Sequence, residues 1–293
     1  GITGNIGGKR SGNENMTFTS ALTIGAGGYN CPVSRVITEI HNEPHRDDDH
    51  FCGGYREYWD NVEGLGGEEG PIEIHFIDEV LPGYFWLFPV QGNRVNVGIG
   101  MLISEHRKLK ADRKKSLKKI QKWVINEHPR FKKRFANATL VSGSEKGWQL
   151  PFGSPRKKSP SPFQPRRAAM AGAVCVGDAA SLVDPFSGEG IGNALLSAKL
   201  TASHFDKDLH KDGFTEEAAF EYMNNLWGAL GSELTNSKTL QKVMKWKLLT
   251  NWFVKKASKK EEIGKMMSEM IASKESQKIL WSPWFLMKTL LLP

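Results

Sequence analysis

The sequence predicts an α/β protein in which a strand–turn–helix domain is interrupted by an antiparallel sheet and followed by helices. Two observations carry this prediction. An apolar run at 170–176 leads into Gly177-Asp178 and is followed by a helical pattern over 189–204. Between residues 52 and 101, apolar segments with strand character are separated by turn residues, which is typical of an antiparallel sheet.

The composition is that of an ordinary globular chain long enough for two domains. Of its 293 residues, 39% are hydrophobic and 25% are charged. The formal net charge of +8 favours an anionic partner such as a phosphorylated substrate, lipid headgroups or nucleic acid. The cysteines (Cys31, Cys52 and Cys175) lack metal-site spacing and predict a reduced, cytoplasmic setting. The most apolar segment, 279–293, is too short and too interrupted to span a bilayer.

The front of the chain predicts a strand that ends at a glycine-rich turn. Residues 16–25 alternate and then become apolar, and they run into IGAGGYNCPVSR at 24–35. The glycines within 1–15 have neither a preceding strand nor a following apolar helix, so they do not form a dinucleotide-binding fingerprint. Because the chain opens on Gly1, we expect an upstream portion to be missing.

The middle of the chain predicts the sheet and one basic helix. Strands are expected at 52–60, 71–80, 83–90 and 94–101, with turns at Pro82-Gly83 and Gly92-Asn93. A helix is expected over 104–126, with Leu117, Ile120 and Val124 on one face and many lysines and arginines on the other.

The rear of the chain predicts a linker and a helical region. Residues 151–167 are rich in proline, serine and basic residues, which indicates a linker or loop. From Phe214 onward, apolar stripes at helical spacing predict three or four helices.

The segment GDAASLVDPFSGEGIGNAL, residues 177–195, carries the strongest chemical signal. A buried strand that ends in Gly-Asp places a carboxylate at the edge of a sheet where α/β proteins bind ligands. Asp178 can accept hydrogen bonds from ribityl or ribose hydroxyls. The glycines that follow let backbone amides approach a flat ring, and the helix start offers its N–H groups and positive dipole end. The alternative is a plain strand–turn–helix that uses glycine for packing.

This segment resembles the second flavin motif of FAD-dependent oxidoreductases of the hydroxybenzoate-hydroxylase type. The resemblance implies that Asp178 contacts the ribityl and pyrophosphate region, and that the helix start faces the isoalloxazine N1 and C2 carbonyl. The cofactor-binding residues that it implies in this segment are Gly177, Asp178, Pro185, Gly188, Glu189, Gly190, Ile191 and Gly192.

The segment at 24–35 resembles the Gly-Ala-Asp-Gly motif of the same superfamily. The resemblance implies that Gly25, Gly28 and Arg35 also support the cofactor. Cys31 stands where serine is usual, and Gly27 occupies the place of the usual aspartate. An ordinary glycine turn after a strand is the alternative.

A third motif, YFWLFPVQGNRVNVGIG at 84–100, places three aromatic side chains on one face of a strand. Such a stripe is often simple core. The motif also resembles the signature of geranylgeranyl reductases, which lines their isoprenoid pocket. That resemblance implies a substrate site made of Tyr84, Trp86, Phe88, Pro89, Gly98 and Gly100.

Together the resemblances imply a geranylgeranyl reductase-like enzyme of the FAD-dependent oxidoreductases. It would use FAD, with NAD(P)H or ferredoxin as electron donor, to saturate isoprenoid double bonds of a lipid or prenyl diphosphate. We expect a partial FAD-binding Rossmann-like domain from 1–38 and 150–205, an inserted antiparallel β substrate domain at 39–149, and a helical C-terminal region at 206–293. The family's N-terminal GxGxxG segment has no counterpart in these residues.

Two other hypotheses remain open, an FAD-dependent monooxygenase and a truncated, non-catalytic lipid-binding peripheral protein. Basic and Trp/Leu-rich helices suggest peripheral contact with a membrane; a solvated face for the basic helix and packing onto the core for the Trp/Leu-rich helices are the alternatives. No recognition motif supports nucleic-acid binding. The sequence names no proton donor or other catalytic residue. His41, His45, His50 and His75 invite a metal site, but their acidic, solvated loop context argues against one.

Overall fold

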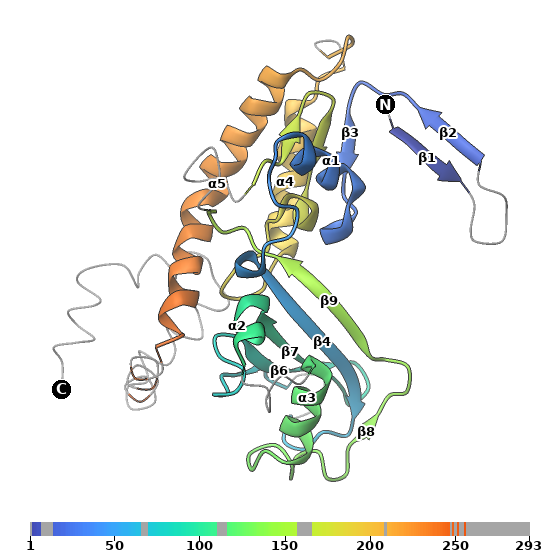
Figure 1. Cartoon of the computed structure of the whole chain (residues 1–293). Helices are drawn as coiled ribbons and strands as arrows, with labels where there is room; N and C mark the ends of the chain where they lie inside the picture. The colour runs from blue at the N-terminus through green and yellow to red at the C-terminus, as the bar shows by residue number, and fades with distance from the viewer. Residues whose placement is uncertain are drawn as a thin grey trace. The chain divides into compact units, whose positions relative to one another are not determined.

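The computed structural model describes residues 2–6, 14–65, 70–109, 116–156, 166–207 and 210–246, together with 248, 251 and 255 (Figure 1). They form two compact units. Described residues up to Arg46 and those of Pro151–Lys238 belong to the first unit, and those of Asp47–Leu150 and from Thr239 to 255 belong to the second. The domain roles expected for these segments stay a prediction.

The first unit opens with a hairpin and a short strand. Strands β1 (Ile2–Ile6) and β2 (Glu14–Phe18) pair antiparallel, and β3 (Thr23–Gly25) follows. The single strand predicted for 16–25 is therefore wrong, because β2 and β3 pair in different sheets and the chain changes direction between them. Helix α1 (Pro32–Ile40) begins with proline at its first turn, where the missing N–H costs nothing.

The remaining strands of this unit come from the other end of the chain. Strands β10 (Ala169–Met170) and β11 (Ala173–Cys175) form a hairpin, and β11 pairs parallel with β3, so that the three-stranded sheet has the order β10-β11-β3. Strands from the two segments expected to share a domain, 1–38 and 150–205, therefore pair in one sheet. The continuous strand predicted at 170–176 is wrong, because Gly172 takes a left-handed turn conformation between β10 and β11.

Two helices complete the first unit. Helix α4 (Ile191–His204) starts at the glycine-rich turn, and α5 (Glu216–Val243) is one continuous helix of 28 residues (Figure 1). The α5 residues Tyr222, Leu226 and Leu230 belong to the same buried cluster as Val174 and Leu182. The further helices predicted after Phe214, the segment at 279–293 and the centre of the 151–167 linker lie outside the described residues.

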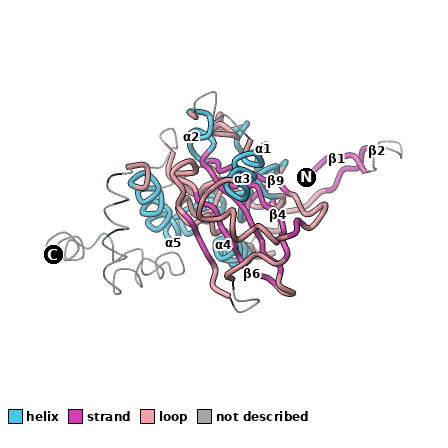
Figure 2. Tube along the Cα trace, turned by 90° about the horizontal axis from the view of Figure 1, so that it is seen from below, coloured by secondary structure: helices cyan, strands magenta, loops and turns pink. Residues whose placement is uncertain are grey.

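The second unit is the predicted antiparallel sheet. Its strands are β4 (Phe51–Asp60), β5 (Glu73–His75), β6 (Tyr84–Val90), β7 (Arg94–Leu102), β8 (Thr139–Leu140) and β9 (Lys146–Pro151). The order is β5-β6-β7-β4-β8, and β9 pairs with β4 and runs beside it in Figures 1 and 2. Gly92 and Asn93 both take positive φ in the tight turn that fixes the β6–β7 register.

The basic helix predicted at 104–126 is wrong as a single element. Helix α2 (Ile103–Lys108) ends at Leu109, which is extended, and α3 (Leu117–Asn126) begins only after Ser116, whose hydroxyl accepts from the amide of Lys119. The α3 residues Ile120 and Val124 do lie in one buried cluster with the sheet. Among the described helices, none combines the length and apolar character needed to cross a membrane.

Candidate functional site

The turn between β11 and α4 depends on one close approach. After β11 the chain enters a 3-10 helix at Gly177–Ala180, and Gly177 has φ +55°. Its amide donates to the Ser197 hydroxyl at 3.0 Å, and a Cβ on Gly177 would lie 3.0 Å from the Ala194 Cβ. Glycine at 177 therefore lets this turn approach α4 closely.

Two carboxylates hold the second half of this turn. The Asp184 Oδ1 accepts from the amides of Phe186 (2.9 Å) and Ser187 (2.7 Å). The Glu189 Oε1 accepts from the amide of Gly192 at 2.7 Å and so caps the start of α4. The glycine-rich helix start is thus preformed, with an anionic oxygen already placed at one of its amides.

Asp178 differs from these two carboxylates. It is half-buried, and no donor among the described residues hydrogen-bonds its carboxylate. Burial raises the pKa of Asp178 above its ordinary value, because the charged form loses solvent without gaining a partner. The Asp178 Oδ1 lies 3.5 Å from the point where a Cβ on Gly190 would stand, so it faces the helix start.

The remaining residues of the two predicted flavin motifs divide by exposure. Pro185 is buried in the turn, whereas Ile191 is 77% exposed at the start of α4. Gly28 has φ +69°, and a Cβ added there would meet nothing within 4 Å. Arg35 is exposed on α1, and Gly25 is packed tightly among side chains. The structure thus offers a partly open backbone surface beside a half-buried carboxylate.

The aromatic stripe lies on β6 and does not form the core of the second unit. Phe85 and Leu87 point into the buried cluster and are fully buried, whereas Tyr84, Trp86 and Phe88 are half-buried on the opposite face. The alternative that the stripe is simple core is therefore wrong. The Trp86 ring centroid lies 5.9 Å from that of Tyr84 in edge contact and 5.9 Å from that of Phe88 in a stack.

The strand register explains why glycines accompany the aromatic residues. Trp86 is paired with Gly98 and Tyr84 with Gly100 across β6 and β7. A Cβ on Gly98 would stand 2.0 Å from the Trp86 ring, so the ring occupies the space that a side chain would need. The Trp86 Nε1 donates to the Asn96 Oδ1 at 3.1 Å, a positioning contact that the sequence did not indicate.

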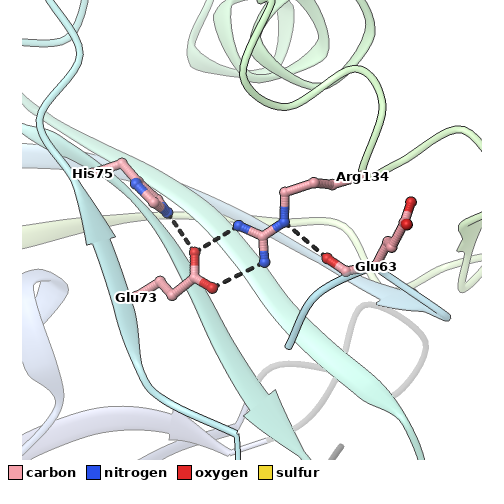
Figure 3. Close-up of polar contacts among 4 residues, drawn as sticks. All are labelled: Glu63, Glu73, His75 and Arg134. Carbon is pink, nitrogen blue, oxygen red and sulfur yellow. Dashed lines mark hydrogen bonds and ion pairs between the residues drawn. The ribbon is translucent and has the colours of Figure 1, made fainter. Parts of the chain in front are cut away.

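A polar cluster that sequence reasoning missed also lies in the second unit (Figure 3). The Arg134 guanidinium binds Glu73 through two hydrogen bonds of 2.7 and 2.9 Å, and it donates to the Glu63 carbonyl at 2.8 Å. Burial would raise the pKa of Glu73, but the bonds from Arg134 and His75 lower it. Burial lowers the pKa of His75, which bonds Glu73 at 2.7 Å. These contacts tie β5 to the turns beside it.

The histidines considered as metal ligands each contact a different neighbour. The His41 ring bonds the Ile37 carbonyl, His50 lies 3.8 Å from Asp47, and His45 is packed near Arg166. Within the described ranges, no three His, Cys, Asp or Glu side chains are grouped as metal ligands.

Solved structures with similar folds are flavin-dependent enzymes and a reductase-like protein. A geranylgeranyl bacteriochlorophyll reductase-like protein from Thermoplasma acidophilum aligns over 77% of this chain and 54% of its own, with a TM-score of 0.54 and 20% identity. A triple mutant of the flavin-dependent brominase Bmp2 gives 0.55 at 14% identity, covering 76% of this chain and 52% of its own. The flavin-dependent halogenase CmlS gives 0.53 at 18%, covering 77% and 37%. The chain therefore shares the fold of these proteins over about three quarters of its length.

Sequence comparison finds similarity to one family of reductases. Residues 52–141 match the model of the geranylgeranyl reductase catalytic domain. A digeranylgeranylglycerophospholipid reductase of Methanococcoides burtonii is 27% identical over 177 residues, which cover 60% of this chain and 38% of that protein. The one from Picrophilus torridus is 29% identical over 189 residues, which cover 64% and 38%. Residues 52–141 are therefore similar to the geranylgeranyl reductase catalytic domain, and the chain spans about two fifths of the length of these relatives.

Proposed function

We propose that this chain is part of an FAD-dependent reductase that saturates double bonds in the isoprenoid chains of a prenyl lipid or prenyl diphosphate. The observation that carries the proposal is the half-buried aromatic stripe of Tyr84, Trp86 and Phe88, because it lies within the family-matched segment on the face turned away from the core. The names of the archaeal relatives support a lipid substrate.

The turn between β11 and α4 fits the cofactor. The Asp178 carboxylate accepts hydrogen bonds from ribityl hydroxyls, and this gives it the partner that the described residues lack. The backbone at Gly28 is open, and beside Gly192 an added Cβ would meet only the Glu189 carboxylate, so a flat ring can approach both, while Gly25, Gly177 and Pro185 hold the two turns in shape. Arg35 adds a positive charge on α1. When bound, FAD supplies the hydride.

The aromatic stripe binds the isoprenoid chain by apolar contact. The stacked rings of Trp86 and Phe88 offer faces that bury a branched hydrocarbon and stabilise positive charge as it develops on an alkene carbon. Gly98 and Gly100 lack side chains opposite Trp86 and Tyr84, which leaves room for these two rings. Pro89 continues the strand beside its partner Val95. NAD(P)H or ferredoxin is the proposed source of electrons.

Exposed lysines support a weak contact with a membrane surface that carries the substrate. On α3, Lys118, Lys119 and Lys122 accompany the buried face formed by Ile120 and Val124. Anionic headgroups attract such a surface with about 1 kcal/mol for each basic residue that comes near. We propose a cytoplasmic protein that meets its lipid substrate at the membrane.

The test is anaerobic turnover of a geranylgeranyl lipid by protein loaded with FAD and reduced chemically, with products followed as gains of two mass units per bond. Trp86→Ala should lower turnover of long chains at least tenfold and leave the flavin content unchanged. Trp148→Ala, a tryptophan on β9 that is 58% exposed, is the matched control and should keep wild-type turnover. Unchanged turnover in Trp86→Ala would contradict the substrate assignment. Hydroxylated product formed with consumption of oxygen would favour a monooxygenase.

A further inference from the structure

Two cysteines far apart in the sequence meet in the core of the first unit. Cys31 precedes α1 and Cys175 ends β11, and their exposed fractions are 2% and 1%. Both sulfur atoms lie 2.9 Å from the point where a Cβ on Gly25 would stand. Because Gly25 is the register partner of Cys175, its missing side chain is what lets the two sulfurs converge.

A buried guanidinium lies beside this pair. Arg166 is 1% exposed, and it donates to the His45 carbonyl (2.9 Å), the Ser34 hydroxyl (2.7 Å) and the Ala179 carbonyl (3.1 Å). All three acceptors are neutral, and the Arg166 Nε has no acceptor. Within the described part of the chain, no carboxylate forms an ion pair with it.

The charge of Arg166 therefore acts on the sulfurs. Its electrostatic partners are Cys175, Glu43 and Cys31, and the Glu43 carboxylate is already bonded to the amide of Arg167 at 2.8 Å. A hydrogen bond from the Cys175 thiol, against the effect of burial, lowers the pKa of Cys31 well below its ordinary value. The same bond raises the pKa of Cys175, which keeps its proton. Cys31 is thus the sulfur more readily deprotonated, and Cys175 is the thiol that donates to it.

We propose that Cys31 and Cys175 form a reversible, redox-active dithiol in which Cys31 is the attacking sulfur, Cys175 is the resolving sulfur and hydrogen peroxide is the oxidant. The proposal does not depend on the isoprenoid substrate or on bound flavin. Neither cysteine belongs to the residues that the flavin resemblance implies.

The chemistry proceeds in two balanced steps. The Cys31 thiolate attacks one peroxide oxygen, so that an S–O bond forms, the O–O bond breaks and hydroxide leaves. The sulfur loses two electrons and becomes a sulfenic acid. The Cys175 thiol then attacks that sulfur, so that the S–S bond forms, the S–O bond breaks, and the sulfenic oxygen leaves as water with the thiol proton. A dithiol reductant reverses the result by thiol–disulfide exchange.

Cys52 provides an internal control in the same chain. It is buried on β4, and burial raises its pKa to about 12. Its side chain donates to the Gly53 carbonyl at 3.3 Å. A thiol in that environment reacts slowly with peroxide, so Cys52 should stay reduced while the other two cysteines are oxidised.

The experiment exposes the whole 293-residue chain to a few equivalents of hydrogen peroxide, removes the peroxide and titrates thiols after denaturation. We expect the thiol count to fall from three to one, the intact mass to fall by two units and a reductant to restore both. Peptide mapping should find Cys31 linked to Cys175 and Cys52 alkylated. Three remaining thiols, under conditions that oxidise free glutathione, would overturn the proposal, and so would a disulfide that includes Cys52.

Single substitutions separate the two roles. Cys175→Ser should leave Cys31 as a sulfenic acid that a dimedone probe captures, whereas Cys31→Ser should leave Cys175 and Cys52 reduced. Cys52→Ser is the matched control and should still lose two thiols. Dimedone labelling of Cys175 in the Cys31→Ser protein as fast as that of Cys31 in the Cys175→Ser protein would contradict the assignment of the attacking sulfur. Circular dichroism melting curves of each variant identify any that fail to fold.

Discussion

Glycine serves opposite purposes in the turns of the first unit and in the sheet of the second. In the turns of the first unit, a side chain added at Gly28 would enter open space, whereas one added at Gly98 in the sheet would collide with the Trp86 ring. The first region keeps backbone accessible, and the second fills the vacant volume with the protein's own aromatic group. A glycine-rich motif therefore does not by itself show whether the space is meant for a ligand or for the protein.

The carboxylates of the two regions show the same contrast. Glu73 in the sheet is bound by Arg134 and His75, and its pKa is lowered. Asp178 in the turn has no such partner, and its pKa is raised by burial. One carboxylate stabilises the fold, whereas the other is half-buried without a hydrogen-bond donor among the described residues.

The largest effect should come from filling the space in the sheet. Gly98→Ala should destabilise the protein by about 3 kcal/mol, because the new methyl group forces the Trp86 ring out of its position. Gly100→Ala is the matched control on the same strand, since its nearest contact would be 3.4 Å from the Cys52 sulfur. Denaturant unfolding of both variants measures the difference, and equal loss in both would contradict the role given to Gly98.

Acid should weaken the sheet through His75 and Glu73. Because both pKa values are lowered in the folded state, the stabilisation is complete above the ordinary values of 6.5 and 4.5 and is lost as pH falls through and below them. Glu73→Gln should cost about 2 kcal/mol at pH 7, because it leaves the Arg134 charge without its bidentate partner. Melting temperatures from pH 5 to pH 3 test the Glu73 part, and the variant should show the shallower slope there, because only the wild type loses the Glu73 contribution as pH falls below 4.5. An unchanged slope would mean that other groups dominate.

Removing the charge of the unpaired carboxylate should affect ligand binding more than folding. Asp178→Asn should weaken FAD binding about tenfold, which corresponds to one hydrogen bond to a charged acceptor of roughly 1.5 kcal/mol. The stability of the flavin-free protein should stay the same or rise, because a buried charge is gone. Fluorescence titration with FAD measures the affinity. Clear destabilisation without a loss of affinity would assign Asp178 a structural role.

The smallest effect is expected at the start of α4, where stability and binding should change in opposite directions. Gly192→Ala should stabilise the flavin-free protein by roughly 0.5 kcal/mol, since glycine is a poor helix former and the new Cβ would lie at an ordinary 3.6 Å from the Glu189 carboxylate. Flavin affinity should fall, because the methyl group narrows the approach to the helix amides. A rise in both quantities would show that this glycine serves no ligand.

The sequence was sufficient to predict the features that depend on local pattern. Alternation and turn residues identified β4, β6 and β7, and the Gly-Asp motif located the turn before α4. A strand was predicted at 71–80, but the observed strand β5 covers only Glu73–His75, because the residues after it form the turn that leads to Gly83. The 71–80 segment is apolar because Ile77 and Val80 are buried in that turn.

The features that the sequence could not reveal depend on partners distant along the chain. Arg166 lies in a basic stretch that is typical of a linker, yet it is buried because its acceptors come from Ser34, His45 and Ala179. Glu57 is likewise buried by donors from Tyr55, Trp59 and Gln121. Side chains along β4 alternate between buried and less buried positions, and Glu57 stands at a buried one. That position in the strand was the sequence signal that could have indicated its burial.

The parallel pairing of β3 with β11 has a consequence for the order of folding. Val174 pairs with Ile24, so the chain must close a loop that contains the whole β4–β9 sheet before this contact forms. The β5, β6 and β7 hairpins need only short loops, and such local contacts form sooner. Pulse-labelled hydrogen exchange should therefore find the amides of β6 and β7 protected before those of β11, so that the turn that follows β11 is assembled late.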